Sequence, residues 1–203
     1  MSTFLVADTH FSHNRAIELC GRPFLSVGEM DEALIRNWNS VVGPDDTVYH
    51  LGDCCMGQLA DSLPILNRLN GRKLLVLGNH DRPSQAYHHK TPEARAKWFA
   101  RYQEYFPVMF EELRLDLGPN GETVIFNHMP YADPTFVDHA YEGRHAQFQP
   151  INEGRWLIHG HVHGAWKTKG KQINVGVDVW GYAPVDLDVV INMMKENPDG
   201  FPS

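Results

Sequence analysis

Short apolar stretches that end in aspartate, asparagine or histidine recur in five separate segments of the 203-residue chain. Three of these stretches, residues 3–7, 47–51 and 72–77, are typical of buried β-strands that run into polar loops. In open α/β sheets, ligands collect beyond the carboxyl ends of the strands, where loops converge. The pattern therefore predicts a single site that draws on Asp8 and His10; Asp53; Asn79, His80 and Asp81; His128; and His161 and His163.

Helix and strand signals continue through the rest of the chain. Ser26 and Glu29 have capping-box spacing ahead of a helical run that reaches residue 42, and Thr91 with Pro92 opens a second helix that reaches residue 105. Further strands are predicted at residues 113–117 and 123–127, which form a hairpin, and at 155–158 and 171–177, with a last helix at 185–197. This order predicts a mixed sheet in an α/β (α+β layered) fold, and the length suits a single domain, residues 1–203.

Charge and composition limit the partners. A net charge of −7 argues against binding of duplex nucleic acid, but it is compatible with a small phosphorylated ligand if a bound metal reverses the local field. No apolar run approaches the roughly 18 residues needed to cross a bilayer, and the N-terminus lacks the features of a signal peptide. We therefore expect no membrane association and a cytoplasmic location, with the three cysteines reduced.

Each polar segment taken alone is a weak signal, because aspartate and glycine are ordinary turn residues. The sequence His-Gly-His-Val-His at residues 159–163 is stronger, since three histidines in five residues are uncommon outside metal sites. The joint occurrence of all five segments, each after an apolar stretch, is the feature that favours a metal site. His50 and His159 are predicted to be hydrogen-bonded core residues.

The five segments together resemble the motifs of the calcineurin-like metallophosphoesterases. That family's motifs run in the order D-x-H, G-D, G-N-H-[DE], H and G-H-x-H, and here they are filled by residues 8–10, 52–53, 78–81, 128 and 160–163. The resemblance covers about residues 4–180 and is strongest to compact bacterial and bacteriophage-type members. It implies a two-sheet β-sandwich flanked by helices, with a dinuclear metal centre at the strand ends.

The resemblance also implies which residues bind each of the two metal ions. Asp53 would bridge two divalent ions, since a carboxylate has two oxygens to share. The first ion would also take Asp8, His10 and His163, and the second would take Asn79, His128 and His161. Mn²⁺ is the expected metal, with Fe, Zn, Ni or Co as alternatives, because oxygen and imidazole donors without thiolate suit borderline ions.

Two residues are implied to act on the substrate rather than on the metals. His80 would protonate the departing oxygen, and Asp81 would hold the His80 imidazole in the required tautomer. Substrate contacts are predicted, less directly, for four more residues, where an ordinary solvated loop or salt bridge is the alternative: His13, Asn14, Arg22 and Arg82.

The expected function is a metal-dependent phosphoesterase acting on small phosphodiesters, with 2′,3′-cyclic nucleotides as one possibility. The expected chemistry is in-line attack by a hydroxide held between the ions. The alternatives are a phosphomonoesterase or a nuclease of the same family, or a non-catalytic scaffold that keeps the fold. The substrate partner would be a small phosphate ester, and nucleotides belong to that class.

Overall fold

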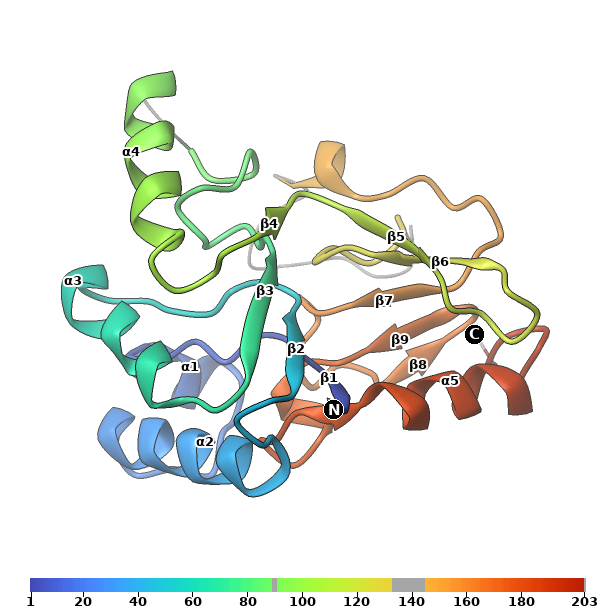
Figure 1. Ribbon diagram of the computed structural model, residues 1–203, viewed down its shortest axis with the longest axis horizontal. Helices are drawn as coiled ribbons and strands as arrows, with labels where there is room; N and C mark the ends of the chain where they lie inside the picture. Colours follow the sequence, from blue (N-terminus) through green and yellow to red (C-terminus); the bar gives the residue numbers. More distant parts are fainter. Residues whose placement is uncertain (89–90, 133–144, 203) are drawn as a thin grey trace.

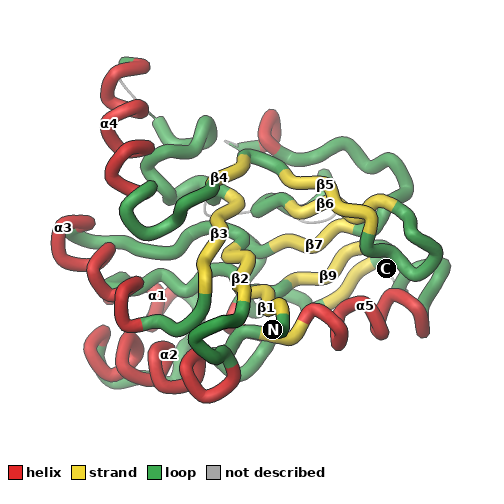
Figure 2. The backbone as a smooth tube through the Cα atoms, in the orientation of Figure 1, coloured by secondary structure: helices red, strands yellow, loops and turns green. Residues whose placement is uncertain are grey.

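The computed structural model describes residues 1–88, 91–132 and 145–202. Within these residues, two five-stranded mixed sheets lie face to face and helices flank them (Figure 1). Figure 2 shows the strands in the interior of the molecule and the helices at its periphery. The expected α/β fold with two sheets flanked by helices is confirmed.

The first sheet brings the first three predicted strands into parallel register. Its order is β10-β1-β2-β3-β4, in which β1 to β4 are parallel and β10 is antiparallel to β1. The strands are β1 (Thr3–Val6), β2 (Thr47–His50), β3 (Arg72–Val76), β4 (Met109–Phe110) and β10 (Val185–Asp186). Because β1, β2 and β3 point the same way, the loops that follow them emerge at the same edge of the sheet.

The second sheet likewise brings the loops that carry the later histidines to one edge, because its central strands are parallel. Its order is β5-β6-β7-β9-β8, in which β6, β7 and β9 are parallel and β5 and β8 are antiparallel edge strands. The strands are β5 (Leu113–Asp116), β6 (Thr123–Phe126), β7 (Leu157–His159), β8 (Thr168–Lys169) and β9 (Gln172–Asn174). The predicted hairpin of β5 and β6 is confirmed.

The helices begin where the capping signals predict. In α2 (Val27–Val41) the Ser26 side chain accepts the Glu29 N–H, and in α4 (Pro92–Tyr102) the Thr91 side chain accepts the Ala94 N–H. The remaining helical elements are α1 (Asn14–Leu19), α3 (Leu59–Ser62), α5 (Leu187–Glu196) and the 3₁₀ segments η1 (Leu63–Arg68), η2 (Ala146–Phe148) and η3 (Val177–Val179).

Alternation of side chains along β1 divides the core into two layers. Phe4 and Val6 pack with the α2 residue Trp38, on the helical side of the first sheet. Leu5 packs with Phe126 and with other residues of the second sheet, between the two sheets. Both layers are buried, so the strand ends are held rigidly where the polar loops begin.

Candidate metal centre

A left-handed backbone turns the expected donors toward one another. In the described residues, seven non-glycine residues have positive φ, and five of them are expected metal ligands: Asp8 (58°), His10 (49°), Asp53 (57°), His161 (72°) and His163 (48°). Such conformations are uncommon outside glycine, cost about 1–3 kcal/mol each and cluster at functional sites. The fold therefore stores strain at the residues that the sequence marks as donors.

Glycines let two of these loops pass close together. Gly52 has φ of 91°, and a Cβ at this position would lie 2.6 Å from the Gly78 backbone. A Cβ at Gly78 would in turn overlap the Asp53 carboxylate. The glycines of the G-D and G-N-H motifs are thus required by this approach of the two loops.

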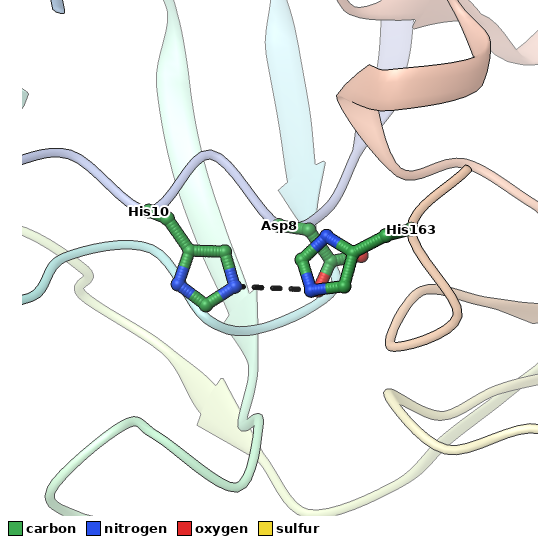
Figure 3. Close-up of side chains that lie close together, drawn as sticks. All are labelled: Asp8, His10 and His163. Carbon is green, nitrogen blue, oxygen red and sulfur yellow. Dashed lines mark ion pairs between the residues drawn. The ribbon is translucent and has the colours of Figure 1, made fainter. Parts of the chain in front are cut away.

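Asp8, His10 and His163 form the first group of donors. One ligand atom from each lies within 4.8 Å of the others, and the rings converge on the Asp8 carboxylate (Figure 3). The distance from His10 Nε2 to Asp8 Oδ1 is 4.0 Å. The other Asp8 oxygen, Oδ2, accepts the backbone N–H of His161 at 2.9 Å, which fixes the carboxylate.

Asp53 lies at the middle of the site. Its Oδ2 is 3.7 Å from His10 Nε2, 3.4 Å from His128 Nε2 and 3.9 Å from His80 Nε2. Its Oδ1 accepts the backbone N–H of His80 at 2.8 Å. Asp8, Asp53 and His128 also form a second group whose ligand atoms lie within 4.8 Å of one another. One oxygen of Asp53 therefore faces histidines from three separate segments.

Asn79 joins the remaining histidines. Its Oδ1 is 3.0 Å from His128 Nε2 and 3.1 Å from His161 Nδ1. His128 Nδ1 lies 2.7 Å from the Leu51 carbonyl, which can only accept, so Nδ1 carries the proton and Nε2 is left toward the site. The structure thus brings all seven expected ligand residues to one place.

The donor set fits divalent cations. Asp8 Oδ1 and both ring nitrogens of His10 are buried without a hydrogen-bond partner among the described residues. Buried polar atoms of this kind are costly unless something satisfies them. Carboxylate, amide oxygen and imidazole donors suit borderline divalent ions.

The buried groups perturb one another strongly. Burial raises the pKa of Asp8 and lowers the pKa of His10 well below its usual value. Burial alone would lower the pKa of His128, but the Asp53 and Asp8 carboxylates and the hydrogen bond to the Leu51 carbonyl together outweigh it and raise that pKa to about 9. Without metal, His128 therefore carries a second ring proton, on Nε2, at neutral pH, and a cation bound at Nε2 would displace it.

Asp81 has a different task from the one expected. Its carboxylate accepts the backbone N–H of Gly78 and of Asp53 at 2.9 Å each, and the N–H and thiol of Cys54 at 3.2 Å each. Among the described residues these contacts account for both oxygens, so Asp81 does not hold the His80 ring. It fastens the G-N-H-D loop to the G-D loop instead.

Arg22 also departs from expectation. Its side chain is fully buried, and its five N–H groups donate to the Asp178 carboxylate, to the Asp8 and Thr9 carbonyls and to Met30 Sδ. No donor is left for a phosphate oxygen, so the predicted substrate contact of Arg22 is wrong. Because all of its N–H groups donate to protein acceptors, the Arg22 guanidinium stabilises the protein structure around the site.

The other three predicted substrate residues have different surroundings. His13 is partly buried, with its ring centroid 5.2 Å from that of His10, whereas Asn14 is exposed at the start of α1. The Arg82 guanidinium lies over the Tyr87 and Trp98 rings, at 4.7 and 5.2 Å. A role in substrate binding stays a prediction for these residues.

Asp178 is the residue that sequence reasoning missed. Its Oδ2 accepts from His163 Nδ1 at 3.0 Å, and both of its oxygens accept from Arg22. It belongs to η3, after the last motif, and no spacing pattern marks it. Burial would lower the pKa of His163, but hydrogen bonding to Asp178 and to Cys20 raises it to about 11.

His50 and His159 are core residues, as predicted. Both are fully buried: His50 Nε2 lies 2.9 Å from the Thr9 hydroxyl, and His159 Nδ1 lies 2.7 Å from the Gly160 carbonyl. Burial lowers the pKa of each imidazole to about 3. Both rings are therefore neutral in the folded chain at any pH where the protein is handled.

This burial predicts a loss of stability in acid. The folded pKa of His159 lies below the unfolded value of 6.5, so its stabilising effect is present above pH 6.5 and is lost as the pH falls toward 3. Each such histidine contributes a slope of about 1.4 kcal/mol per pH unit. We expect His159→Gln to lower the pH slope of the unfolding free energy by this amount between about pH 6 and 4.5. Urea unfolding with chelator present measures the slope. An unchanged slope in the variant would contradict this assignment.

A cavity of about 950 Å³ lies beside the donors. Asn79 and His80 form its wall on the side of the centre. The rest of the wall includes the rings of Tyr87 and Phe148 and the amide-bearing residues Gln85 and Gln147. His80 thus borders both Asp53 and a space large enough for an organic ligand.

None of the helices in the described ranges has the length and apolar character to cross a membrane.

Comparison with known proteins finds relatives of this chain in an archaeon and in phages. No family model matches the chain. It is 31% identical to the uncharacterized protein MJ1445 of Methanocaldococcus jannaschii over 202 residues, which cover 95% of this chain and 91% of that protein. It is 33% identical to the gene 66 protein of Mycobacterium phage L5 over 192 residues, 89% of this chain and 88% of that protein. The chain belongs to the family that contains these archaeal and phage proteins.

One solved structure shares the fold over almost its whole length. The protein of unknown function AQ665 from Aquifex aeolicus superposes with a TM-score of 0.67 and 26% identity, covering 95% of this chain and 98% of that one. The names of these relatives state no reaction.

Proposed function

We propose that the chain is a metal-dependent phosphoesterase of the calcineurin-like type, which hydrolyses small phosphodiesters. The observation that carries the proposal is the position of Asp53 Oδ2, within 3.4 to 3.9 Å of Nε2 of His10, His80 and His128. This carboxylate oxygen lies between histidines of different segments, which is the position that a ligand shared by two cations requires. The left-handed backbone at five donors supports a functional rather than a structural cluster.

The donors divide into two sets around Asp53. With Asp53, the group of Asp8, His10 and His163 would hold one divalent ion. The group of Asn79, His128 and His161, again with Asp53, would hold the second. Bound as a pair, divalent ions supply a clamp for phosphoryl oxygens and an activated water, and Mn²⁺ is the first choice for this donor set.

His80 would serve the leaving group in this reaction. Its backbone N–H is held by Asp53 Oδ1, and its side chain is 23% exposed on the cavity side. A histidine that borders both the centre and the substrate space can donate a proton to a departing alkoxide. Asp81 would support this role indirectly, by holding the loop that carries His80.

The cavity supports an ester with an organic substituent of some size. A bare phosphate would leave most of about 950 Å³ unfilled. Tyr87 and Phe148 contribute aromatic side chains to the lining, and Gln85 and Gln147 contribute amides that donate and accept hydrogen bonds. A planar group with polar edges matches this lining, and the base of a 2′,3′-cyclic nucleotide has that chemistry.

A panel of esters tests the proposal. We expect turnover of bis-p-nitrophenyl phosphate and of 2′,3′-cyclic nucleotides with Mn²⁺, abolished by chelator. The corresponding monoesters, p-nitrophenyl phosphate and 3′-nucleotides, should be hydrolysed less efficiently. Preference for the monoesters would indicate a phosphomonoesterase. Failure of every ester, including single-stranded oligonucleotides, with both metal positions filled would indicate a scaffold.

Removing the aromatic face of the cavity should weaken binding of a nucleotide. We expect Phe148→Ala to raise KM for a 2′,3′-cyclic nucleotide by about 5- to 150-fold, since stacking of a base on an aromatic ring is worth roughly 1–3 kcal/mol. The KM for ribose 2′,3′-cyclic phosphate, which keeps the cyclic ester and has no aromatic group, serves as the comparison. Equal changes in KM for both esters would argue against stacking.

A further inference from the structure

Asp178 and Arg22 form a buried ion pair behind the donors. Arg22 Nε lies 2.8 Å from Asp178 Oδ1, and Arg22 Nη2 lies 3.0 Å from Asp178 Oδ2, so the contact is bidentate. The Arg22 side chain is fully buried, and that of Asp178 is 3% exposed. The partners are 156 residues apart in the chain, and they connect the loop between α1 and α2 to η3.

Each partner of the pair also holds an expected ligand of the same ion. Arg22 Nη2 donates to the Asp8 carbonyl at 2.6 Å, and Nη1 donates to the Thr9 carbonyl at 3.0 Å, where Asp8 has its left-handed backbone. Asp178 Oδ2 accepts from His163 Nδ1 at 3.0 Å. One continuous network therefore runs from the Asp8 loop to the His163 ring.

The contact to Asp178 also selects the free nitrogen of His163. A carboxylate can only accept, so Nδ1 of His163 must carry a proton. Nε2 is then the ring nitrogen that can bind a cation. A carboxylate or carbonyl behind a histidine commonly orients metal ligands in this way and strengthens them as donors.

Stability alone gives a poor reason for this pair. Replacing a buried ion pair with apolar residues is often neutral or stabilising, because desolvation of the two charges is costly. Here the guanidinium additionally spends two donors on the backbone at Asp8 and Thr9. The pair is explained if it serves to hold the expected metal ligands Asp8 and His163 in position.

We propose that Arg22 and Asp178 are positioning residues that fix Asp8 and His163 as ligands of one of the two divalent ions. The inference rests on the proposed metal-dependent function. It assigns the network to one ion only, because among the described residues no hydrogen bond or ion pair joins Arg22 or Asp178 to the ligands proposed for the second ion, Asn79, His128 and His161.

Calorimetric titration of chelator-treated protein with Mn²⁺ tests the proposal. The wild type should bind two ions per chain. Asp178→Asn should weaken one of the two binding events by about 10- to 100-fold and leave the other within a few-fold of wild type. Asp178→Glu, which keeps the carboxylate, should lose less. The matched control is Asp188→Asn, which removes the same charge at an exposed position of α5.

The outcomes separate this inference from the proposed function. Equal weakening of both ions in Asp178→Asn, or no weakening, would overturn the positioning role while two ions still bind the wild type. A wild type that binds no Mn²⁺ would overturn the proposed function and this inference with it. If Asp178→Asn does not fold, Arg22→Lys keeps the positive charge without the fork and should show the same loss at one ion.

Discussion

Replacing Asp53 by asparagine is expected to lower the occupancy of the metal centre below two ions per chain. Asp53 Oδ1 is held by the His80 N–H, so the asparagine oxygen should take that position. The amide NH₂ would then replace Oδ2, where Nε2 atoms of His10 and His128 lie at 3.7 and 3.4 Å. A neutral donor group would face the place where a shared anionic oxygen is needed.

The expected loss exceeds the roughly 10- to 100-fold drop in metal affinity that removal of an outer hydrogen-bond partner causes. Elemental analysis should find fewer than two ions per chain in Asp53→Asn, with kcat/KM reduced in parallel. Asp61→Asn, at an exposed position of α3, is the matched control and should bind metal as the wild type does. Full occupancy with full activity in Asp53→Asn would remove the bridging role.

His80→Ala should have the opposite signature, with metals retained and turnover lost. His80 contributes its backbone N–H to Asp53, which alanine preserves, while the imidazole beside the cavity disappears. Loss of a general acid should lower kcat by about 10²- to 10⁴-fold for an ester with a poor leaving group such as an alkoxide. The centre itself should remain occupied, as elemental analysis can show.

The identity of the leaving group provides the internal comparison for this variant. A nitrophenolate departs without protonation, so kcat for bis-p-nitrophenyl phosphate should fall much less than kcat for a nucleotide ester. The ratio of the two losses measures proton donation directly. Equal losses for both esters would assign His80 to another role, such as binding of the phosphate.

Convergence of the donors was predictable because it depends on a simple property of parallel strands. Asp8, Asp53 and Asn79 follow three parallel neighbours in the first sheet, and His128 and His161 follow two in the second. Short apolar stretches and capping residues are local signals, so β1, β2, β3 and the N-terminus of α2 could be placed from sequence.

What the sequence could not predict depends on contacts between distant residues. Asp81 binds backbone N–H groups of another loop, and Asp178 binds Arg22 across 156 residues, so neither role follows from spacing. The two-residue strands β4 and β10 are too short to show alternation. The left-handed backbone at His161 and His163 could not be predicted from sequence, because only a small fraction of non-glycine residues adopt it, even though histidine does so more often than most.

Electron paramagnetic resonance of the Mn²⁺-loaded protein tests the central claim most directly. If two ions share Asp53, they lie roughly 3.5–4 Å apart. The spectrum should then be that of a spin-coupled pair once two equivalents per chain are bound. Asp53→Asn should abolish the coupling. A wild-type spectrum of isolated Mn²⁺ at full loading, or no bound Mn²⁺ at all, would contradict a shared centre.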